Sequence, residues 1–111
     1  MVKLDGNKIS MTRGDTVQFK VNLTNQYDEP YIPVSTDHIY FRVKQIPEKK
    51  GVTFEKEVNL EDMTITLEEE DTAELKEGTY YYEIELVSSN NFHFTAITKT
   101  PLKLTTEIED H

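Results

Sequence analysis

The chain has 111 residues, 36% hydrophobic and 30% charged, which suits one domain with a modest core. It contains no Cys, which excludes disulfides, thiolate metal sites and a cysteine nucleophile. The net charge is −9, made up of +2 over residues 1–50 and −11 over residues 51–111, and such a surface repels nucleic acid. We expect a single domain spanning residues 1–111. We also expect it to be made in a reducing cytoplasm, because the sequence has neither an apolar signal segment nor a run of about 18 apolar residues for a membrane span.

Short alternating segments fill the first half of the chain. Residues 9–11 predict a brief first strand, and residues 17–23 predict a half-buried strand because apolar and polar side chains alternate there. Residues 25–37 predict a loop, in which Pro30 cannot donate a ladder hydrogen bond. Residues 39–43 predict a third strand with the same alternation.

The second half continues the pattern with one helical interruption. Residues 52–60 predict a strand with polar Lys56 at an inward position, and residues 63–67 predict another short strand. Residues 71–77 predict a helical turn of at most about two turns. After a polar turn at Ser88–Asn91 we expect a strand at 94–98 and a separate extended piece from Pro101.

The segment from Asp71 to Leu86 is the most informative. Asp71 is expected to cap the helical turn and Gly78 to end it in a left-handed conformation. Tyr80 then starts a strand, and its hydroxyl is expected to bond back to residues 71–75 as a tyrosine corner. The inward face of this strand is formed by Tyr80, Tyr82, Ile84 and Leu86.

This succession predicts an all-β fold, an immunoglobulin-like antiparallel β-sandwich of seven to eight strands with one short helical turn before strand F, the strand that Tyr80 starts. The chain has neither the Cys pair nor the Trp of antibody domains, so its core must rest on aliphatic and aromatic packing.

Several fragments together resemble the immunoglobulin-like domain of bacteriophage and prophage tail and baseplate proteins. The resemblance extends from about Ile9 to Ile108, although the turns at Asp28-Glu29, Asn90-Asn91 and Lys99-Thr100 replace glycines frequent in that family. It implies a structural or adaptor module with no catalytic residues to carry over. The matching fragments are RGDT at Arg13–Thr16, Pro30-Tyr31, FRVK at Phe41–Lys44, DTAEL followed by GTYYYEIEL, and the Thr-rich stretch Thr95–Thr98.

Four tyrosines are candidates for a contact surface. Because successive side chains of a strand point to opposite faces, Tyr40 and Tyr81 are expected to point away from the core. Tyr27 and Tyr31 lie in the predicted loop. Tyr combines contact area with a hydroxyl, as protein interfaces and sugar-stacking platforms require. Because the third strand and strand F are expected to be neighbours, Tyr40 and Tyr81 are expected to form one patch.

Other motifs have plainer interpretations. Arg13-Gly14-Asp15 matches the integrin tripeptide but precedes a strand, which favours a turn. The acidic run 68–71 lacks calcium-loop spacing, and His38 and His93 lack metal-ligand spacing. We therefore expect no catalytic, cofactor or metal site.

The sequence thus favours a non-enzymatic virion module of a phage tail, baseplate or fibre, made in the bacterial cytoplasm and acting by protein contact. Its expected partners are other virion or tail proteins, or further copies of the chain, and neither nucleic acid nor membrane. The alternative is a carbohydrate-binding or host-adhesion module that binds a host surface glycan through exposed tyrosines. A domain of a larger bacterial surface protein is a third interpretation.

Overall fold

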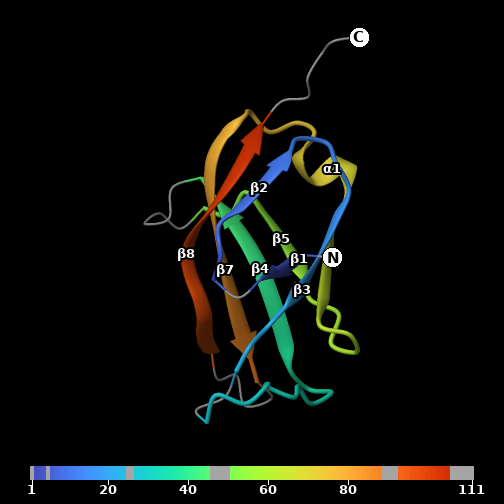
Figure 1. Cartoon of the computed structure of the whole chain (residues 1–111), viewed down its shortest axis with the longest axis vertical. Coiled ribbons are helices and arrows are strands. Elements are labelled where there is room, and N and C mark those ends of the chain that lie inside the picture. Colours follow the sequence, from blue (N-terminus) through green and yellow to red (C-terminus); the bar gives the residue numbers. More distant parts are fainter. Residues whose placement is uncertain (1, 5, 25–26, 46–50, 89–92, 106–111) are drawn as a thin grey trace.

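The computed structural model describes residues 2–4, 6–24, 27–45, 51–88 and 93–105, and these contain eight strands and one short helix (Figure 1). The sequence also predicts a basic turn at Lys49-Lys50, between Pro47 and Gly51; it lies outside the described residues, as does Asn90-Asn91 of the predicted polar turn. The elements are β1 (Val2–Leu4), β2 (Ile9–Thr12), β3 (Val17–Val21), β4 (His38–Lys44), β5 (Phe54–Glu57), β6 (Thr64–Leu67), α1 (Glu69–Thr72), β7 (Gly78–Val87) and β8 (His93–Thr105).

The strands form two sheets, one with the order β2-β8-β7-β4-β5 and one with the order β1-β3-β6. The all-β class is confirmed, but the purely antiparallel arrangement is wrong, because β1 pairs with β3 and β2 with β8 in parallel. The parallel register sets Ile9 beside Leu102 and Met11 beside Leu104, and all four side chains are buried. Burial of these apolar residues therefore fixes the register of this parallel pair, because a shift of one residue would expose them.

One hydrophobic core lies between the two sheets. The predicted alternation of β4 and β7 is confirmed, since every second residue from Ile39 to Val43 and from Tyr80 to Ile84 is buried. Their rings pack closely, with the centroids of Phe41 and Tyr82 5.2 Å apart. The three-stranded sheet contributes Phe19, Val21, Ile65 and Leu67.

Helix α1 begins earlier than the sequence suggested. Glu68 precedes the first helical turn, and Asp71 lies inside that turn, so the prediction of Asp71 as the N-cap is wrong. Its carboxylate instead reaches back and accepts a hydrogen bond from the Glu68 backbone N–H at 2.7 Å. The same Asp71 oxygen lies 2.9 Å from the Lys56 ammonium, which explains a lysine at an inward position of β5.

The start of β7 departs from the prediction by a few residues. Gly78 has φ +146° and begins β7, whereas the helix already ends at Thr72, so Gly78 does not end the helix. The Tyr80 hydroxyl donates to the carbonyl of Lys76 at 2.9 Å, just beyond the predicted acceptor range 71–75. The bond ties the start of the strand to the turn before it.

Strand β8 is a single strand of 13 residues and not the two pieces predicted. Pro101 lies one residue before the stretch of β8 that pairs with β2. At Pro101 that side of β8 is an open edge of the sheet, and an open edge tolerates a residue without an N–H. Strand β5 is shorter than predicted, and Val52 lies outside it with 45% of its surface exposed.

The Arg13-Gly14 turn packs against α1. The Gly14 N–H donates to the Thr72 hydroxyl at 2.8 Å, and the Arg13 guanidinium donates to the Leu75 carbonyl at 3.0 Å. Gly14 has φ +85°, as a tight turn requires. These bonds give the tripeptide a structural role in the fold.

Candidate functional site

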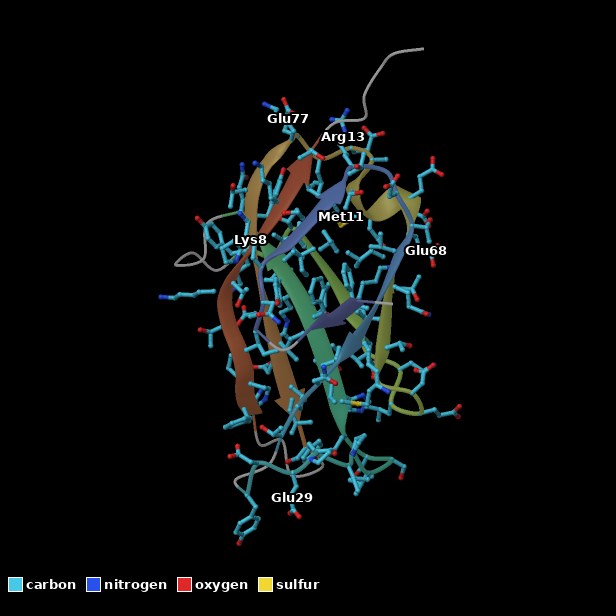
Figure 2. The ribbon with its side chains drawn as sticks, in the orientation of Figure 1. Lys8, Met11, Arg13, Glu29, Glu68 and Glu77 are labelled. Carbon is cyan, nitrogen blue, oxygen red and sulfur yellow. The ribbon has the colours of Figure 1, made fainter. Side chains whose placement is uncertain are left out.

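Exposed apolar side chains gather at one end of the molecule. Residues 27–37 and the start of β8 lie together at the lower end of Figure 1, and Figure 2 places Glu29 there, opposite Arg13 and Glu77. Among the described residues, four of the five large exposed hydrophobic side chains belong to these two segments; the fifth is Val52. We call them the apolar end: Tyr27 at 72% exposure, Ile32 at 82%, Val34 at 58% and Phe94 at 54%.

Beside these side chains the core opens into a hollow of about 480 Å³, the end hollow. Leu86 of β7 pairs with Phe94 of β8, and both line the hollow. Leu23, Tyr27 and Tyr31 line it from the segment that follows β3. The hollow is therefore mainly apolar and aromatic.

A buried carboxylate holds the apolar end in shape. Asp37 is 3% exposed, and one of its oxygens accepts from the Tyr31 hydroxyl at 2.6 Å and from the Val34 N–H at 3.0 Å. The hydrogen bond to Asp37, aided by desolvation and by the carboxylate charge, raises the pKa of Tyr31 to about 12. The Tyr31 hydroxyl is thus engaged within the protein.

The outer face of the five-stranded sheet carries a network of ion pairs. Arg42 binds both Glu55 and Glu85, and Lys44 binds Glu83 at 2.8 Å. The hydrogen bond from Arg42 lowers the pKa of Glu85 despite its desolvation. The two cations of β4 are therefore paired with carboxylates of both flanking strands, β5 and β7.

Tyr40 and Tyr81 do not form the single patch expected. Tyr40 pairs with Glu85, four residues from Tyr81 along β7, which is roughly 14 Å at strand spacing. The Arg42 guanidinium carbon lies 5.1 Å from the centroid of the Tyr40 ring, and His38 stacks on that ring at 6.1 Å. The two tyrosines share a face, but Tyr40 lies within the charged network.

Tyr81 lines a second, smaller hollow of about 250 Å³ on this face, the outer hollow. Tyr81 comes from β7 and Lys44 from β4, while Thr95, Thr98 and Lys99 come from β8. Lys99 has φ +48°, a left-handed backbone that residues with side chains rarely adopt.

The four tyrosines therefore divide among three places: Tyr27 and Tyr31 at the end hollow, Tyr81 at the outer hollow, and Tyr40 in the ion-pair network. Sequence reasoning missed Asp37 and Lys99. Asp37 offered a signal, because a carboxylate between a proline-rich loop and a strand is typical of a turn-stabilising residue. Lys99 offered none in its own residue type or spacing.

Within the described residues, no group of three or more His, Asp or Glu side chains is arranged to hold a metal ion. The same residues include no helix with the length and apolar character needed to cross a bilayer. Comparisons of the chain with protein-family models, with curated proteins and with solved structures find no match.

Proposed function

We propose that the chain is a non-enzymatic structural or adaptor module of a bacteriophage or prophage virion, in the tail, baseplate or fibre. It acts through contact with other virion proteins. The observation that carries this proposal is the apolar end, since exposed apolar side chains gathered at one end of a molecule are typical of protein interaction sites. Asp37 fixes the segment that bears it, so the surface is organised before a partner binds.

The proposal includes an immunoglobulin-like fold. Two sheets around one core support it, as does the order β2-β8-β7-β4-β5. The bond from the Tyr80 hydroxyl to the Lys76 carbonyl has the form of a tyrosine corner, in which a Tyr at the start of strand F bonds to backbone a few residues upstream.

Detection of the protein in particles tests the location. Virions are purified from cultures that carry the gene, and an antibody against the purified chain is used to probe the particles and the cell lysate. We expect the protein in intact particles. Its presence in the lysate together with its absence from the particles would refute the proposal.

A matched pair of variants tests the apolar end as the contact. Ile32→Asp places a charge on the surface that a partner would cover, whereas Val52→Asp places one on the exposed apolar residue outside the apolar end. Incorporation into particles should fall for Ile32→Asp and persist for Val52→Asp. Equal incorporation of both variants would exclude this surface as the contact.

The second candidate is a carbohydrate-binding or host-adhesion module. The observation favouring it is the outer hollow, where Tyr81 lies among residues with hydroxyl and ammonium groups and the carboxylate of Glu83. Tyr27 adds an exposed ring at the apolar end. Tyr40 and Tyr31 are less suited to stack on a sugar, because Arg42 lies against the first ring and the hydroxyl of the second binds Asp37.

A further inference from the structure

We infer that the outer hollow is a binding site for an acidic monosaccharide unit, one that bears a single carboxylate. The Lys99 ammonium binds the carboxylate, and the Tyr81 ring packs against the sugar. This inference extends the carbohydrate-binding alternative and does not depend on a place in a virion, so it can fail while the virion proposal stands.

The backbone of β8 is distorted where it lines the outer hollow. The register runs from Tyr82 opposite Thr100 to Ile84 opposite Ile97, so Thr98 and Lys99 together face the single residue Glu83. This is a β-bulge, a feature concentrated at sheet edges and next to binding sites, where it redirects a side chain.

A second register shift follows one step along the strand. Ile84 pairs with Ile97 and Glu85 with Thr95, which leaves Ala96 as an extra residue. Together the two shifts interrupt the ladder between β7 and β8 over residues 83–85 of β7, directly after the regular pairs that Tyr81 and Tyr82 form.

The conformation of Lys99 has a cost. A residue with a Cβ at φ +48° is strained, because its side chain crowds the backbone in the left-handed region. Glycine would adopt this backbone without that cost, so the lysine is unfavourable for the fold alone. Strain retained at a hollow is consistent with a functional side chain.

The local charge favours one anion. Lys44 is neutralised by Glu83 at 2.8 Å, whereas Lys99 forms no ion pair among the described residues. The outer hollow thus carries about one net positive charge on a chain of net −9. A single carboxylate matches that charge, and a polyanion would be repelled by the net negative charge of the chain.

The remaining lining suits a sugar ring. The hydroxyls of Thr95 and Thr98 can both donate and accept hydrogen bonds, and the Tyr81 ring offers an apolar surface. The volume of about 250 Å³ lies below the roughly 300–1,000 Å³ typical of sites for drug-sized ligands, so it accommodates one ring.

The test is a titration of the ¹⁵N-labelled full chain, followed by NMR, with sodium glucuronate, glucose or sodium acetate. We expect saturable shifts of the amides of residues 81, 95, 98 and 99 with glucuronate. Its affinity should exceed that of glucose and of acetate by about tenfold each, because only glucuronate offers both charge and ring. No saturation, equal affinity for acetate, or equal affinity for glucose would overturn the inference.

Two lysine variants separate binding from folding. Lys99→Gly removes the ammonium and relieves the positive φ, so its urea midpoint should match or exceed that of the parent while the glucuronate shifts disappear. Lys103→Gly, at an exposed lysine of β8 outside the outer hollow, should retain the shifts. The role of Lys99 would be refuted if the amide shifts caused by glucuronate persisted in Lys99→Gly. It would also be refuted if they disappeared equally in Lys99→Gly and Lys103→Gly.

Discussion

The Tyr31 hydroxyl and the Asp37 carboxylate make stability depend on pH in alkaline solution. The hydrogen bond to Asp37 raises the pKa of Tyr31 in the folded chain to about 12, against a usual value of 10.0. The unfolded chain therefore loses the Tyr31 proton at a lower pH than the folded chain. The contribution of this hydrogen bond to the free energy of unfolding is full below pH 10 and is lost as pH rises to about 12. Urea unfolding at a series of pH values should show this decline.

Tyr31→Phe is the control for that titration. The variant lacks the hydroxyl, so it should be less stable near neutral pH by about 1 kcal/mol and lack the Tyr31 part of the decline. A variant with the same alkaline profile as the parent would show that another tyrosine causes the change.

The Tyr80 hydroxyl has a single backbone acceptor, the carbonyl of Lys76. Tyr80→Phe removes the donor and leaves that carbonyl without its partner, so the free energy of unfolding should fall by about 1 kcal/mol. Tyr81→Phe is the matched control, since Tyr81 lies on the outer face. Urea unfolding in which both variants equal the parent would contradict the structural role of this bond.

At the scale of elements, Asp71 joins α1 to β5. Its carboxylate accepts a hydrogen bond from the Glu68 N–H and lies 2.9 Å from the Lys56 ammonium. The side chain of Asp71 is only 14% exposed and that of Lys56 29%. Asp71→Ala removes both contacts and should cost about 1–2 kcal/mol of unfolding free energy in urea. Asp71→Asn keeps an acceptor for the backbone and should lose less.

Glu70→Ala controls for that prediction, because Glu70 is exposed in the same helical turn. Its stability should stay within about 0.5 kcal/mol of the parent. A loss as large as that of Asp71→Ala would mean that removing any carboxylate from this helical turn is destabilising and that the Asp71 contacts are not the cause.

Elements that bury one face were predictable from the sequence. The alternation in β4 and β7 specifies which residues point inward, because a shift of one residue would expose every apolar side chain. The bounds of α1 were not predictable, since Asp is a preferred N-cap residue and Glu is not, yet the helix begins after Glu68 and Asp71 bonds back to the Glu68 N–H. The continuity of β8 was missed because Pro101 normally argues against a strand, and the open sheet edge is a tertiary feature.

The candidate surfaces were predictable only in part. Parity indicated an outward-facing Tyr81, but the bulge that forms the outer hollow depends on β8 pairing with β7. Likewise, Ile32 and Phe94 are separated by most of the chain, and only the fold brings their segments to one end. The sequence contains the residues of each surface, whereas their grouping is a property of the sheets.

At the scale of the whole molecule, both sheets depend on one core without any disulfide. Phe41 is fully buried in β4, and its ring lies 5.2 Å from that of Tyr82 and 6.4 Å from that of Phe54. The core residues of β3 and β6 belong to the same cluster, so neither sheet has a separate apolar interior. We therefore expect the sheets to unfold together.

Phe41→Ala tests this cooperativity. The variant should lose about 3–5 kcal/mol, yet far-ultraviolet circular dichroism and tyrosine fluorescence should give one midpoint in urea. Phe94→Ala, at a phenylalanine that is 54% exposed, should lose less than about 1 kcal/mol. Separate midpoints for the two probes would show that the sheets are independent units, and the chain would then not be the single domain that its shared core implies.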